Sequence, residues 1–155
     1  MGVNRIRIAK DKADLVQALT ASKETTGPFQ TYADVVVFAA ALGVQGKKRV
    51  SLGTISKKEP APIGLEIFVS RGYDLVLKLI AIAETKDTKI ISPSDRAAQE
   101  KRIRIFEEYA NGGLEILRDE LRGAVDYSEQ LLLLLSAQRF REEVTEDSFD
   151  LSKFL

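Results

Sequence analysis

The sequence of 155 residues contains no cysteine and no histidine. The absence of cysteine excludes disulfide bonds and zinc sites built from thiolates. The absence of histidine removes the commonest general base near neutral pH and the commonest metal ligand, so no serine–histidine triad can form. No apolar run approaches the roughly 18 residues that a membrane helix needs, and the N-terminus lacks the pattern of a signal peptide. We therefore expect a cytoplasmic chain with no cofactor, no metal and no membrane partner.

The charges are balanced in number but not in position. Lysine plus arginine and aspartate plus glutamate total 23 each, in a chain that is 45% hydrophobic and 30% charged, which is typical of one globular domain. Residues 1–58 hold ten basic and four acidic side chains, whereas residues 101–155 hold eight basic and twelve acidic ones. A basic N-terminal part is a hint of nucleic-acid contact, and it is equally compatible with a solvated basic surface.

The first residues alternate between apolar and basic side chains. Successive side chains of an extended chain point to opposite faces, so Ile6 and Ile8 share one face and Arg5 and Arg7 share the other. This pattern predicts a short strand with one buried and one cationic face. The same arginines could also form the solvated face of an ordinary edge strand.

Two helices are predicted to follow the strand. Apolar residues recur at helical spacing after the N-cap candidate Asp11, and a second helix is expected from the N-cap Thr31 to Gly43. The second helix has no polar residue from position 35 to 42, so it should be covered on every side, by the rest of the chain or by a second copy.

The second half of the sequence predicts further helices. We expect one over residues 63–84, weakened near Gly72, one over 95–110, one over 114–124 and a last one over 127–140. Gly112 and Gly113 should break the chain between two of these helices, or alternatively form an anion-binding turn. Five consecutive leucines at positions 131–135 cannot share one helix face, so the last helix should be deeply buried or lie at a subunit interface.

A short strand followed by two helices is the plan of the ribbon-helix-helix DNA-binding proteins, in which two chains pair their strands into a ribbon that enters the major groove. The predicted strand has no other partner, and a second chain would cover its open edge. On this hypothesis the chain is a homodimer, and loss of both strand arginines should spare the fold. The expected DNA contacts are Arg5, Arg7, Lys10, Thr31, Lys47, Lys48, Arg49, Lys57 and Lys58.

The fold class expected is therefore mainly α, with a ribbon-helix-helix-like strand-helix-helix unit followed by a C-terminal helical bundle. We expect a single domain over residues 1–155, made of the ribbon-helix-helix-like part (1–45), a basic linker (46–62), a helical part (63–141) and an acidic tail (142–155).

Five segments carry a resemblance to a known family: "NRIRIAKDKADLV", "GPFQTYADVVVFAAALG", "ISKKEPAPI", "FEEYANGGLEIL" and "FDLSKFL". Together they resemble the DNA phosphorothioation-associated protein 4 family, also called Dnd system-associated protein 4, over essentially the whole chain. The resemblance implies a bacterial defence system that replaces a phosphate oxygen of DNA by sulfur and restricts DNA that lacks the mark. It supplies no catalytic residues.

Three functions remain open at this point. The first is a DNA-binding or regulatory accessory protein, not an enzyme, that acts as a homo-oligomer beside other proteins of the system. The second is a scaffold that binds such a protein through its leucine-rich helices and acidic tail without touching DNA. The third is a metal-dependent nuclease, for which Asp74, Glu84 and Lys86 are the candidate residues.

Overall fold

The computed structural model describes residues 4–22 and 27–137, which divide between two compact units, residues 1–119 and 120–155. The predicted acidic tail, residues 142–155, lies outside the described part. The first unit begins with the strand β1 (Arg5–Ile6), the 3-10 helix η2 (Lys10–Lys12) and the helices α1 (Ala13–Leu19) and α2 (Tyr32–Gln45). This confirms the expected strand-helix-helix order.

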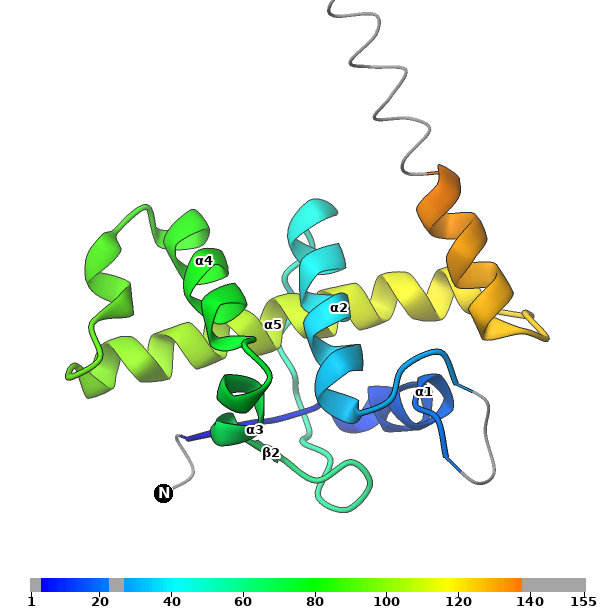
Figure 1. Ribbon diagram of the computed structural model, residues 1–155, viewed down its shortest axis with the longest axis horizontal. Coiled ribbons are helices and arrows are strands. Elements are labelled where there is room, and N and C mark those ends of the chain that lie inside the picture. The colour runs from blue at the N-terminus through cyan, green and yellow to red at the C-terminus, as the bar shows by residue number, and fades with distance from the viewer. Residues whose placement is uncertain (1–3, 23–26, 138–155) are drawn as a thin grey trace, which may run out of the picture. The chain divides into compact units, whose positions relative to one another are not determined.

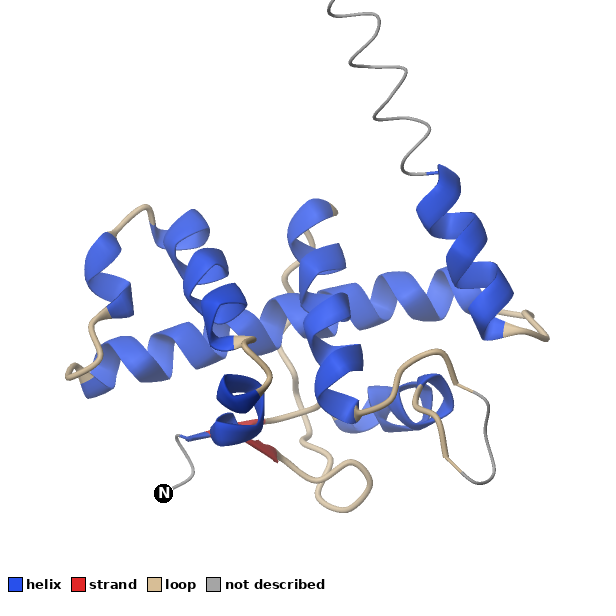
Figure 2. Cartoon of the chain, in the orientation of Figure 1, coloured by secondary structure: helices blue, strands red, loops and turns tan. Residues whose placement is uncertain are grey.

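The remaining elements are also mainly helical, as the sequence predicts (Figure 2). A short strand β2 (Ile63–Gly64) precedes α3 (Leu65–Ser70) and α4 (Asp74–Thr85). The 3-10 helix η3 (Thr88–Ile91) then leads to the long helix α5 (Arg96–Leu121). In the second unit, residues 127–137 are helical. Among the described residues, no helix combines the length and apolar character required to cross a bilayer.

The alternation of the first strand is confirmed, but the expectation that it lacks a partner in its own chain is wrong. Ile6 and Ile8 are buried, while Arg5 and Arg7 are exposed. β1 pairs antiparallel with β2, Arg5 opposite Gly64 and Ile6 opposite Ile63. Residues of the same chain occupy this edge, so this edge of β1 is not open for a second chain.

Helix α5 is the element on which the first unit packs. α2 and α4 lie against it in Figure 1, and the packing of Phe68 of α3 edge-on against Phe106 of α5 joins α3 to the same helix. The ring centroids of these two phenylalanines are 5.7 Å apart, and both side chains are fully buried. The buried face of α5 continues through Leu114 and Leu117.

The predicted helix break at Gly112 and Gly113 is wrong, because α5 runs through both glycines. A Cβ atom on Gly113 would lie 1.6 Å from the carbonyl oxygen of Ala39, and one on Gly112 would lie 1.9 Å from that of Lys48. The glycines therefore let α2 and the chain after it approach the α5 backbone. Gly43 was expected to end α2 but lies inside that helix. It also permits the close approach of α2 and α5, since its Cβ would lie 2.0 Å from the carbonyl oxygen of Tyr109.

One further expectation is corrected by the packing. The helix expected over residues 63–84 is divided into α3 and α4 at Gly72, whose φ of +80° no ordinary helix contains. The described residues of its own chain do not cover α2 on every side: Val37 and Phe38 are half-buried, Ala41 is exposed, and all three line an open groove. That a second copy covers this helix stays a prediction.

Candidate nucleic-acid interface

Three of the predicted DNA contacts come together on one surface of the first unit. Ala9 and Ile55 form an antiparallel bridge, in which the backbone N–H of Lys10 donates to Thr54 O at 2.8 Å and that of Ser56 donates to Ile8 O at 2.8 Å. This bridge places Lys10 beside the residues that follow Ser56, namely Lys57 and Lys58. The three lysines line an open groove of about 540 Å³, which we call the lysine groove.

The lysine groove carries more positive than negative charge. Its three lysines are exposed, and within the described residues none of them makes an ion pair. Asp14 and Glu59 supply the carboxylates of the groove. The carboxylate of Glu59 accepts a hydrogen bond from the Tyr32 hydroxyl at 2.7 Å, which raises the pKa of that tyrosine. One acidic group is thus already engaged, and the lysine ammonium groups remain available to an anionic ligand.

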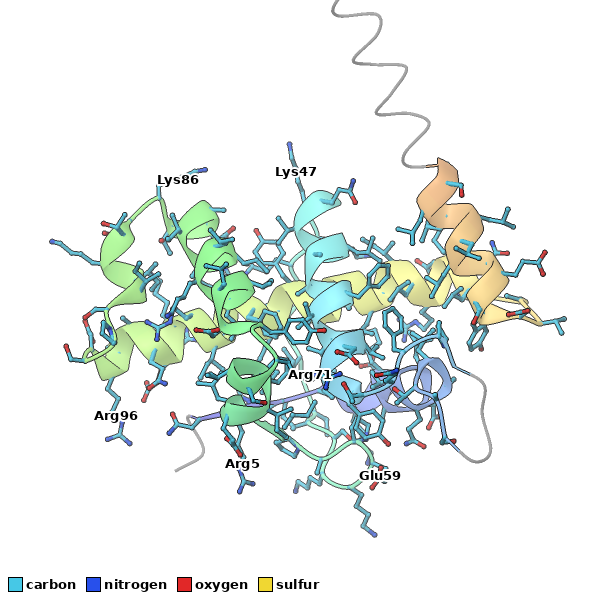
Figure 3. All side chains as sticks on the ribbon, in the orientation of Figure 1. Arg5, Lys47, Glu59, Arg71, Lys86 and Arg96 are labelled. Atoms are coloured by element: carbon cyan, nitrogen blue, oxygen red, sulfur yellow. The ribbon has the colours of Figure 1, made fainter. Side chains whose placement is uncertain are left out.

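Arg5 and Lys47 are also exposed, but they lie at different edges of the first unit. Figure 3 shows Arg5 and Glu59 at one edge, whereas Lys47 and Lys86 project from the opposite one. Because Glu59 belongs to the lysine groove, Arg5 shares that side of the molecule and Lys47 does not.

Arg7 is occupied by the protein itself. Its Nε and Nη2 donate to the two carboxylate oxygens of Glu107 at 3.0 and 2.9 Å, and its backbone N–H donates to Oε2 at 2.7 Å. The Glu107 side chain is fully buried, whereas that of Arg7 is 49% exposed. The hydrogen bonds and the charge of Glu107 raise the pKa of Arg7. Arg7 therefore neutralises a core carboxylate.

The cations after α2 are paired in the same way. Lys48 lies 3.1 Å from Glu115, and Arg49 lies 2.7 Å from Glu108 and 2.9 Å from Glu84. A hydrogen bond from Lys48, reinforced by the charge of other cations, lowers the pKa of Glu115 despite partial burial. These contacts tie the start of the predicted basic linker to α5 and α4.

Thr31 is the remaining predicted contact, and its side chain caps α2 by accepting a hydrogen bond from the backbone N–H of Asp34 at 3.2 Å. The predicted N-cap is thus confirmed. Burial opposes ionisation of Asp34, but hydrogen bonds from Arg71 and from Tyr73, the latter at 2.6 Å, together lower the pKa of its carboxyl. The start of α2 already has an acidic group in place, so an additional anion gains little there.

One buried cation was missed by sequence reasoning. Lys12 is 1% exposed, and its Nζ donates to Asn111 Oδ1 at 3.0 Å and lies 3.6 Å from Glu115. Its partners on α5 are about one hundred positions away in the chain, so no local pattern could have indicated them. Asn111 anchors this lysine from inside α5.

The acids of the nuclease alternative do not converge. Asp74 and Glu84 lie at opposite ends of α4, which at 1.5 Å per residue separates them by about 15 Å. Asp74 lies 3.5 Å from Lys78, and Glu84 binds Arg49 and the Tyr109 hydroxyl. The described part of the chain contains no group of three or more acidic side chains that could hold a metal ion.

Comparison with known protein families places the chain beside one concerned with the modification of DNA. A family model described as DNA sulphur modification system-associated protein 4 matches residues 5–154, nearly the whole chain. No curated protein and no solved structure matches the chain.

Proposed function

Because the chain belongs to the DNA sulphur modification system-associated protein 4 family, we propose that it is a non-catalytic DNA-binding accessory of a bacterial DNA phosphorothioation system. The observation that carries this proposal is the lysine groove, where Lys10, Lys57 and Lys58 stand together without ion pairs among the described residues. Arg5 extends the same side of the molecule.

The proposed contact is to the phosphate backbone. Lysine is a point charge on a flexible stem, which suits phosphate oxygens better than the fixed donor and acceptor pattern of a base edge. The ribbon predicted from the sequence, in which two chains pair their first strands, is not part of the proposal, since β2 occupies an edge of β1. Binding should therefore depend steeply on salt and only weakly on base sequence.

A salt titration tests the proposal. Affinity for a fluorescent DNA duplex is measured by anisotropy at several NaCl concentrations, for the parent and for the triple variant Lys10→Gln, Lys57→Gln, Lys58→Gln. Each lost phosphate contact lowers the magnitude of the log–log slope by about 0.9, so the triple variant should lose about 2.7. A parent that fails to bind duplex at low salt would contradict the proposal.

A matched control separates the groove from overall charge. The triple variant Lys86→Gln, Lys89→Gln, Lys101→Gln removes three exposed lysines of the same unit that lie outside the groove. It should retain the slope of the parent. If both triple variants lose affinity equally, binding reflects net charge, and the lysine groove is not the interface.

The second candidate function is a scaffold that binds another protein of the same system or a second copy of the chain. Of the five consecutive leucines, Leu131 is buried, while Leu132, Leu133 and Leu135 are 66%, 58% and 44% exposed. Exposed leucines in one short helix favour a protein contact. Light scattering of the parent and of Leu132→Ser with Leu133→Ser tests self-association: a dimer that becomes a monomer supports it, and a parent monomer at high micromolar concentration excludes it.

A further inference from the structure

A second cavity, separate from the lysine groove, lies between α3, α4 and the N-terminal half of α5. Its volume is about 190 Å³, and its apolar walls are formed by Leu65, Val69, Leu77 and Ile103. Arg102 of α5 lines the same cavity. An apolar space with one buried cation is the arrangement expected of a site that orients a small amphiphilic ligand.

Arg102 is buried and has no carboxylate partner in the part of the chain that the structure describes. The residue is 8% exposed, and its Nη1 donates to the carbonyl oxygens of Ile90 and Ser92 at 2.6 and 3.3 Å. No carboxylate of the described residues lies within ion-pair distance of it. Burial lowers the pKa of Arg102, which the more distant charge of Asp95 only partly opposes. Burying a guanidinium without an ion-pair partner costs desolvation free energy, so a ligand that supplies the missing anion would explain the position of Arg102.

Arg102 has further donors besides Nη1, and the residue lines the cavity. Within the described residues, Nε and Nη2 of this side chain make no hydrogen bond. Yet among the described residues every fully buried side-chain nitrogen or oxygen has a hydrogen-bond partner. These nitrogens therefore retain access to solvent, and Arg102 is one of the residues that line the cavity. Two neighbouring guanidinium donors match the two oxygens of a carboxylate.

The charge around the cavity selects the class of ligand. Lys78 adds a second positive charge and Asp74 one negative charge, and these two side chains lie 3.5 Å apart. With Arg102 the lining is left with one net positive charge, which a monoanion would neutralise. We propose that this cavity binds a small organic monoanion, a short-chain carboxylate whose alkyl part contacts the apolar walls and whose carboxylate is held by Arg102.

The test uses the full chain and sodium butyrate as the probe. Chemical shifts of the isotope-labelled protein are followed during titration at constant ionic strength, with butanamide as the uncharged control of the same shape. Butyrate should perturb residues of this cavity, with a dissociation constant of roughly 10 mM or tighter for a ligand of about six heavy atoms. Butanamide should bind at least about tenfold more weakly, since it cannot neutralise Arg102.

Three variants decide the role of the charges. Arg102→Met should weaken butyrate binding at least about tenfold. Lys78→Met should weaken it severalfold and Asp74→Asn should strengthen it, because these changes remove opposite charges from the rim. The rim variants change side chains that are about 40% exposed, so they decide the question even if Arg102→Met does not fold.

Four results would overturn the proposal. Equal binding of butyrate and butanamide would remove the charge requirement, and equal binding of butyrate and inorganic phosphate would remove the requirement for an apolar body. Unchanged affinity in both rim variants would exclude the cavity. Displacement of butyrate by a DNA duplex would assign Arg102 to DNA phosphate. Since the lysine groove lies elsewhere, loss of the proposed DNA binding would leave this proposal standing.

Discussion

Replacement of Arg7 separates a role in the core from a role in DNA binding. The change Arg7→Met removes a guanidinium that makes two hydrogen bonds to Glu107, at 3.0 and 2.9 Å, and leaves that fully buried carboxylate with the backbone N–H of residue 7. Removing one partner of a buried ion pair costs about 3–5 kcal/mol. Arg7 is half-exposed, which favours the low end, about 3 kcal/mol of unfolding free energy.

The assays are unfolding by urea and unfolding by heat, both followed by far-ultraviolet circular dichroism. A loss of about 3 kcal/mol should lower the melting temperature by about 6–12 °C in a chain of this size. Arg5→Met is the matched control, because Arg5 lies on the same strand face and has no ion-pair partner among the described residues. Its unfolding free energy should stay within about 0.5 kcal/mol of the parent.

A second variant identifies the cause. Glu107→Gln in the Arg7→Met background removes the buried charge but keeps a carbonyl oxygen for the backbone N–H, so the double variant should recover part of the lost stability. If Arg7→Met unfolds at the same urea concentration as the parent, the pair contributes nothing to the fold. The expectation from the sequence that both strand arginines are dispensable for folding would then be correct.

Two further predictions concern packing and pH. Gly113→Ala should destabilise the protein by several kcal/mol, since its Cβ would lie 1.6 Å from the backbone oxygen of Ala39. Gly46→Ala should cost less stability, because the nearest atom to its Cβ is a methyl group of a movable side chain. Thermal unfolding of the two variants measures the difference. The hydrogen bond from Tyr109, with help from Arg49, lowers the pKa of Glu84. The ionised Glu84 side chain therefore stabilises the fold at a pH above its unfolded-state pKa, and this contribution is lost as pH falls through its folded-state pKa. Tyr109→Phe should reduce the difference in stability between pH 7 and pH 3, measured by urea unfolding.

Local patterns were sufficient for the elements at the N-terminus. Alternation with period two correctly assigned Ile6 and Ile8 to the core, and a threonine three residues before an aspartate correctly placed the start of α2. These signals depend only on near neighbours in the chain. The partner of β1 was missed because Ile63 and Gly64 are more than fifty residues away and were assigned to a helix.

The glycines of α5 show why a local rule failed. Gly112 and Gly113 weaken a helix by about 1 kcal/mol each, which favours a break if nothing else contributes. In the folded chain they permit contact with the carbonyl oxygens of Lys48 and Ala39, and the packing gained offsets the helix propensity lost. That gain depends on residues at least sixty positions earlier, so the sequence pattern around the glycines does not contain it.

The charge asymmetry that suggested DNA binding is partly used inside the molecule. Acidic side chains of α5 and α4 pair with N-terminal cations, so the basic and acidic parts of the sequence neutralise each other across the fold. Among the eight cations predicted to contact DNA, the paired ones are Arg7, Lys48 and Arg49. Lys47 lies at the edge opposite Arg5.

The salt dependence of DNA binding therefore distinguishes the two interpretations of the basic N-terminal part. If all eight predicted cations contacted phosphates, the log–log slope would be about −7, at 0.9 per contact. The folded chain leaves four of them on one side, Arg5 and the three lysines of the groove, which limits the slope to about −3.6 per chain. A slope near −7 for a monomer would mean that Arg7, Lys48 and Arg49 leave their carboxylates on binding, and the assignment of these three cations to ion pairs within the protein would be refuted.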